Sequence, residues 1–186
     1  MATIFTHPVI AVTLGRLTGM PARTITIGCL LSIVPDLDFV AFYTRYEDWH
    51  IIGHRGFTHS FAFAFLAALL ATRFLTPMRA SMEGWWRTVL FLTVCAASHG
   101  MLDACTDGGA GIAFFWPLSD ARFFFPWNPI QVSPIGLEFL QWEGVEVLLS
   151  ELRWVWTPCV VILAAHAALT RRPKAPALQG QPNESR

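Results

Sequence analysis

The sequence predicts an all-α membrane protein, a polytopic helical bundle with about four membrane helices and an aromatic-rich cap in the membrane interface. Of its 186 residues, 54% are hydrophobic and 14% are charged, whereas a soluble domain carries roughly 25% charged residues. Uncharged stretches recur along the chain, and segments containing arginine separate them. This composition argues against a water-soluble monomer.

The uncharged runs are expected to be helical. They cover residues 3–15, 24–35, 56–72, 88–102 and 154–170. A spanning helix needs about 20 apolar residues, with roughly 17 as the lower limit. The third and fifth runs meet that limit, and the fourth meets it with Trp85 and Trp86 as an interfacial anchor. The first two runs are shorter, so we expect them to be half-inserted or packed against the other helices.

Basic residues indicate the orientation, because they accumulate on the cytoplasmic side of membrane helices. Nine of the thirteen lie between the first and second runs, between the third and fourth, or after the fifth. An even number of crossings separates these segments, so all of them can be cytoplasmic. Segments 43–55 and 105–153 are then expected to face the opposite side of the membrane.

The domain organisation is expected to be simple. Residues 1–172 form one membrane-embedded domain, and residues 173–186, rich in Pro, Gln and Ser, form a disordered cytoplasmic tail. Segment 107–134 interleaves aromatic residues with prolines and is too apolar for a solvated loop. We therefore expect it to form the interfacial cap.

Charge balance excludes one class of partner. The chain has 13 basic and 13 acidic side chains, and Lys174 is its sole lysine. Binding to nucleic acid requires clustered Lys and Arg on the phosphates. We expect no nucleic-acid partner, and we expect contact with membrane lipid instead.

Ionisable residues gather where three of the runs begin or end. They are Asp36 and Asp38 in PDLD, His54 and His59 in HRGFTHS, and His99 and Asp103 in HGMLD. With runs two and four travelling outward and run three travelling inward, all three clusters arrive at the non-cytoplasmic end. Ionisable groups near lipid are costly and indicate a functional site.

Local spacing refines this site. His99 and Asp103 are four residues apart and share one helical face, as two ligands of one metal would. Thr58 is a predicted N-cap that places His59 in the first turn of a helix, and Gly56 lets the preceding chain bend to bring His54 back. His7 reaches the same level if the first run enters from that side.

Imidazole and carboxylate ligands without an obvious thiolate fit zinc or a similar divalent cation. The cluster exceeds the needs of one tetrahedral ion, so one or two ions are expected. A two-metal site suits phosphoester hydrolysis, with water activated by lowering of its pKa. The guanidinium of Arg55 could hold a phosphate oxygen.

The ordered motifs HPVIA, PDLD, HRGFTHS and SHGMLDACTDGG resemble the YdjM-like family of bacterial inner-membrane, metal-dependent hydrolases. The resemblance covers residues 1–135, and HRGFTHS with the downstream H-x-x-x-D is its most specific part. That family is distantly similar to zinc-dependent phospholipase C and the related zinc nucleases. By motif, the implied metal ligands are His7, Asp36 or Asp38, His54, His59, His99 and Asp103.

The resemblance also implies a location and a limit. A multi-pass protein of the bacterial inner membrane with the orientation above has its metal site facing the periplasm and its C-terminus in the cytoplasm. The soluble relatives complete a third metal site with a second H-x-x-x-D or H-x-x-x-E element, and none follows Asp103. A centre of one or two metals is therefore expected.

The sequence is compatible with three functions. In the first, a metal-dependent hydrolase cleaves a phosphorylated lipid, with Asp36 or Asp38 as ligand or general base and Arg55 stabilising the developing charge. In the second, a transporter uses the same residues as a metal transit site, which requires a polar path to the cytoplasmic face. In the third, a structural membrane protein uses the polar pairs to hold helices together.

Overall fold

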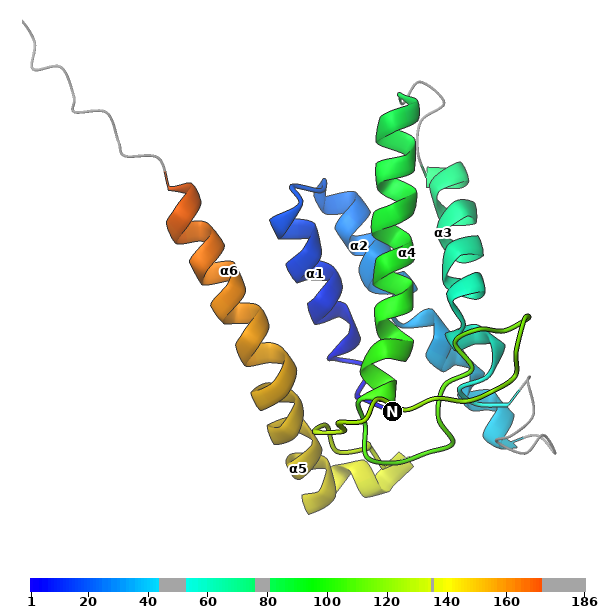
Figure 1. The fold of residues 1–186 in the computed structure, drawn as a ribbon. Coiled ribbons are helices and arrows are strands. Elements are labelled where there is room, and N and C mark those ends of the chain that lie inside the picture. The colour runs from blue at the N-terminus through cyan, green and yellow to red at the C-terminus, as the bar shows by residue number, and fades with distance from the viewer. Residues whose placement is uncertain (44–52, 76–80, 135, 172–186) are drawn as a thin grey trace, which may run out of the picture.

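The structure is a computed structural model that describes residues 1–43, 53–75, 81–134 and 136–171 (Figure 1). Its α-helices are α1 (His7–Leu17), α2 (Ala22–Leu31), α3 (Phe61–Leu75), α4 (Met82–Ala104), α5 (Trp142–Glu151) and α6 (Thr157–Thr170). Short 3-10 segments are η1 (Val34–Tyr43), η2 (Phe57–His59) and η3 (Gly136–Leu140), and η4 (Leu152–Trp156) is a π turn. The described residues contain isolated β-bridges but no strand, so the all-α prediction is confirmed. The predicted disordered tail lies outside the described residues.

The α1–α2 hairpin and α3 pack against α4, and α6 packs against α1 (Figure 1). The core between them contains Ala11, Ile25, Ala68, Phe91, Leu92 and Cys95. A Cβ on Gly15 would lie 2.5 Å from a side-chain carbon of Ile25, so α1 and α2 approach closely only because this position is glycine. The two shortest predicted runs, 3–15 and 24–35, are therefore packed against other helices. This was one of the two arrangements expected for them.

Four helix ends meet at one end of the bundle. There α1 begins, α2 ends, α3 begins and α4 ends (Figure 1). The other end holds the α1–α2 turn, the start of α4 and the end of α6. Arg87 of α4 donates a hydrogen bond to the Thr18 carbonyl in that turn. Successive helices from α1 to α4 thus run in alternate directions between the two ends, as the positions of the basic residues predicted.

The predicted membrane spans differ from the helices in the structure. Among the described residues, one continuous helix is long and apolar enough to cross a membrane, and it runs from Trp142 to Thr170. It begins before the predicted run at 154–170, because the chain is already helical from Trp142, within the segment 105–153 that was expected to face the opposite side of the membrane. The apolar helix from Phe61 is shorter than a span. The expectation of about four membrane helices stays a prediction.

Proline explains the irregularity within this long helix. Pro158 has no N–H to donate to the carbonyl four residues earlier, and the π turn η4 occupies this position. Glu151 lies directly before the turn and is buried, whereas most neighbouring side chains are exposed. The turn thus marks the place where the helix contacts the rest of the molecule through a polar side chain.

The segment that follows α4 folds over the end of the bundle where the four helix ends meet (Figure 1). Ile112 pairs with Phe123 through two backbone hydrogen bonds, and Ile112 and Phe114 are buried against Ala104 at the end of α4. Phe124 and Trp127 remain 43% and 62% exposed. This loop, residues 105–134, contains the predicted cap segment 107–134, and the place of that cap in the membrane interface stays a prediction.

Candidate metal centre

The four helix ends bring imidazole and carboxylate groups to one point. Asp36, His59, His99 and Asp103 each offer one ligand atom, and these atoms all lie within 4.8 Å of one another. All four side chains are buried. The residues come from η1, η2 and α4, so the convergence predicted from the order of the helices is present in the structure.

Two ring nitrogens face each other at the centre of this group. His59 Nε2 lies 3.0 Å from His99 Nε2. His99 Nε2 also lies 3.3 Å from Asp36 Oδ1, and His59 Nε2 lies 3.6 Å from Asp103 Oδ2. Atoms that ligate one cation approach each other at such distances.

The opposite ring nitrogens fix the orientation of both imidazoles. His99 Nδ1 lies 2.8 Å from the Ser32 carbonyl oxygen, which can only accept, so Nδ1 donates the proton and Nε2 is the nitrogen that has a lone pair in the neutral ring. His59 Nδ1 lies 3.2 Å from Asp38 Oδ2. Such contacts to the second nitrogen are typical of histidines that bind metal.

His7 completes the donor set from the first residue of α1. Its ring is fully buried and stacks on His99, with centroids 3.8 Å apart. Its Nε2 lies 3.8 Å from Asp36 Oδ2 and 3.8 Å from Asp103 Oδ1. The structure therefore brings His7 to the level of the cluster.

Several buried polar atoms in this region have no hydrogen-bond partner in the described part of the chain. They are both ring nitrogens of His7, both carboxylate oxygens of Asp36, Oδ2 of Asp103 and Nε of Arg55. Burying such groups unpaired is costly, and native proteins avoid it. Unpaired oxygens and a ring nitrogen around one point fit a divalent cation held by nitrogen and oxygen ligands.

The two aspartates of PDLD have different surroundings. Successive side chains of a 3-10 helix are about one third of a turn apart, so residues two apart point in different directions. Asp36 faces His99, whereas Asp38 faces His54 and the Nδ1 side of His59. The geometry thus favours Asp36 as the ligand beside His99 and Asp38 as the group that orients His59.

Asp38 is held by four donors. Its Oδ1 lies 2.6 Å from His54 Nδ1, and its Oδ2 accepts from the Thr58 hydroxyl at 2.6 Å and from the Arg55 amide at 3.2 Å, with His59 also in contact. Burial acts to raise the pKa of Asp38, but the hydrogen bonds from His54 and His59 outweigh it and hold the pKa below its usual range. Asp38, His54 and His59 form a second group that could hold a cation.

His59 experiences both carboxylates. Burial alone would lower the pKa of His59, but Asp103 and Asp38 raise it to about 9. A cation at Nε2 would have to replace a proton there, while Asp38 keeps the proton on Nδ1. His59 is therefore the residue that links the two groups.

Local structure around HRGFTHS differs from the prediction in two ways. Thr58 does not cap the helix, because its hydroxyl donates to Asp38, and α3 begins after Ser60, whose Oγ accepts from the Phe63 amide. The left-handed residue of the bend is Arg55, with φ 62°, and not Gly56. His59 consequently lies in η2, one short turn before α3.

Arg55 has a different environment from the one predicted. It is 1% exposed, donates to the Gly108 carbonyl and the Thr106 hydroxyl, and its Nε lies 3.5 Å from Asp103 Oδ2. These contacts balance the charge of Asp103 and join the cap to the site. They do not favour the predicted contact with a substrate phosphate.

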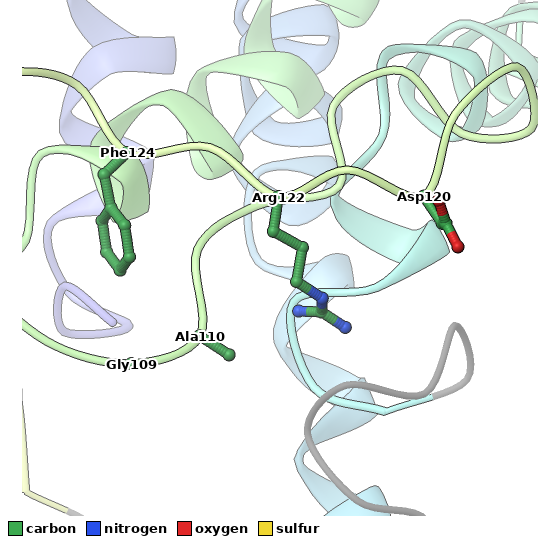
Figure 2. Close-up of a pocket in the computed structure, with 5 residues that line it drawn as sticks. All are labelled: Gly109, Ala110, Asp120, Arg122 and Phe124. Carbon is green, nitrogen blue, oxygen red and sulfur yellow. The ribbon is translucent and has the colours of Figure 1, made fainter.

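Arg122 in the cap was not singled out in the sequence. Its Nη1 donates to the carbonyls of His54, Arg55 and Gly111. It also lines a pocket of about 420 Å³ together with Gly109, Ala110, Asp120 and Phe124 (Figure 2). The only available signal was an arginine between aromatic residues, which does not indicate where its side chain lies.

A small residue permits the close approach of α4 to η2. A Cβ on Gly100 would lie 2.9 Å from the His59 carbonyl oxygen. Any larger residue would push α4 away from η2. This glycine therefore allows the rings of His59 and His99 to meet.

Comparisons with known proteins agree with the motifs. The family model described as YdjM inner membrane protein matches residues 1–174. The inner membrane protein YbcI of Escherichia coli K12 is 39% identical over 167 residues, which cover 88% of this chain and 95% of YbcI. No solved structure matches the chain. The chain belongs to the YdjM family of inner membrane proteins.

Proposed function

We propose that this protein is a membrane-bound, metal-dependent hydrolase that cleaves a phosphoester of a lipid or lipid-linked substrate with metal-activated water. The observation that carries the proposal is the set of buried, unpaired oxygen and nitrogen atoms around one point at the end of the bundle. Proteins place perturbed, buried ionisable groups in this way mainly at functional sites.

The cation would be held by His59, His99, Asp36 and Asp103, with His7 as a further donor. These ligand types suit Zn²⁺, and a second ion could use Asp38 and His54. A bound zinc ion supplies a Lewis acid and lowers the pKa of water near neutrality. The protein itself orients the imidazoles through Ser32 and Asp38.

The cap suits an amphipathic substrate. Its pocket contains a cation in Arg122, an anion in Asp120 and an aromatic surface in Phe124 (Figure 2). The pocket adjoins the site through Gly109, because a Cβ there would overlap the Arg55 guanidinium, which contacts Asp103. We place the polar part of the substrate in this pocket and its apolar part against the exposed rings of the cap.

The interior favours hydrolysis over transport. The described buried imidazole, carboxylate and guanidinium side chains are His7, Asp36, His54, Arg55, His59, His99, Asp103 and Glu151. They lie at the end of the bundle where the cap folds, whereas the core beyond them is apolar. A cation crossing the protein would need a series of ligands there, and the described core offers only the thiols of Cys95 and, at its edge, Cys29.

A hydrolysis assay tests the proposal. The protein, purified in detergent, is incubated with bis(p-nitrophenyl) phosphate and with a short-chain phospholipid in micelles. We expect hydrolysis that stops on chelation, returns with zinc, and is lost in His99→Ala. His166→Ala, on α6 and away from the site, is the matched control and should keep the wild-type rate. Equal rates in wild type and His99→Ala would contradict the proposal.

A further inference from the structure

Glu151 is a buried carboxylate outside the group of candidate ligands. It ends α5 and is 1% exposed, although the long helix around it presents mostly exposed apolar side chains. A carboxylate at such a place is costly unless hydrogen bonds satisfy it. Its partners therefore indicate why the helix carries it.

All the described donors to Glu151 come from the segment before α1. The backbone amide of Thr3 donates to Oε1, and the hydroxyls of Thr3 and Thr6 donate to Oε2 at 2.6 and 2.7 Å. Trp156 Nε1 donates to the Thr6 hydroxyl at 2.7 Å, which leaves that hydroxyl's proton directed at Glu151. Glu151 thus joins the long helix to residues 3–6 through charge-assisted hydrogen bonds.

Residues just before and just after the two threonines that contact Glu151 reach the metal centre. The Ala2 amide donates to Asp103 Oδ1 at 2.8 Å, so Oδ2 is the oxygen left toward His59. Thr6 is the residue before α1, and His7 follows it directly. Residues 2–7 therefore orient one carboxylate and supply one imidazole, and Glu151 holds them in the middle.

We propose that Glu151 is a positioning residue of the metal centre, which sets the places of His7 and of the Asp103 carboxylate by anchoring Thr3 and Thr6. This inference rests on the proposed metal site and not on the hydrolysis reaction. It makes the long helix a part of the site, although that helix supplies none of the candidate ligands.

Metal affinity is the readout that tests it. Zinc affinity is measured by competition with a chromophoric chelator for the wild type, Glu151→Gln and Glu151→Ala in detergent. Outer-shell groups change metal affinity by roughly 10–100-fold. We expect a loss of about 10-fold for Glu151→Gln, which keeps the volume, and of about 100-fold for Glu151→Ala. Glu146→Gln, an exposed acid on the same helix bonded to Trp142, is the control and should bind as the wild type does.

Thermal unfolding of the metal-free proteins separates positioning from stability. Lower affinity in folded variants, beyond any change in the metal-free melting temperature, supports the inference. Variants that melt earlier but bind zinc with wild-type affinity while folded overturn it. If Glu151→Ala does not fold, Thr6→Val removes one hydroxyl and the same criteria apply. A wild type that binds no metal would instead refute the proposed metal centre.

Discussion

Asp103→Asn is expected to abolish stoichiometric metal binding while leaving the protein folded. The amide oxygen of Asn can still accept from the Ala2 amide, as Asp103 Oδ1 does. The other oxygen, Oδ2, has no hydrogen-bond partner and faces His59, His99 and the Nε of Arg55. An amide NH₂ there cannot ligate a cation and adds no negative charge. Metal content per chain, measured by mass spectrometry after purification with zinc, checks this result.

Asp38→Asn is the matched comparison for this variant. Asp38 contacts Nδ1 of His59 and not the atoms that face His99. We expect it to retain metal with affinity lowered by roughly 10–100-fold, as for other outer-shell groups, and Asp103→Asn to lose more. The same metal content in Asp103→Asn and wild type would contradict the assigned centre. A greater loss of metal in Asp38→Asn than in Asp103→Asn would make Asp38 the metal ligand and Asp103 the group that orients His59.

Removal of metal is expected to destabilise the wild type substantially. A ligand that binds only the folded state at 1,000 times its dissociation constant stabilises by about 4 kcal/mol. For a domain of this size each kcal/mol moves the melting temperature by roughly 2–4 °C. We therefore expect chelation to lower the melting temperature in detergent by about 10 °C, because Asp36 and Asp103 lose the cation that compensates their burial.

The variants show whether that shift comes from the site. Asp103→Asn should melt at the same temperature with and without chelator, since it has no metal to lose. His166 lies on α6, away from the site, so chelation should lower the melting temperature of His166→Ala as much as that of the wild type. A chelator effect of equal size in Asp103→Asn would mean that another group binds the metal.

The central part of the site was predictable because it depends on helix order. Once the basic segments are placed at one end, alternation of the helices brings PDLD, HRGFTHS and HGMLD to the other end. The spacing of four between His99 and Asp103 fixes their shared face on α4. Both features depend only on the period and the direction of helices, which are local properties of the sequence.

Other features depend on contacts between distant residues and were not predictable. The choice between Asp36 and Asp38 requires the path of η1, and the role of Thr58 requires Asp38 as its partner. Glu151 meets Thr3 across the length of the chain. The last helix begins before the uncharged run at 154–170, because Glu151 and Arg153 bound that run in the sequence but do not end the continuous helix from Trp142.

X-ray absorption at the zinc edge of the zinc-loaded wild-type protein most directly tests whether these imidazole and carboxylate groups bind one cation together. We expect imidazole nitrogen and carboxylate oxygen ligands at about 2.0–2.2 Å, with the imidazole signal reduced in His99→Ala. A sulfur ligand at about 2.3 Å, or a spectrum of hydrated zinc without imidazole, would contradict it.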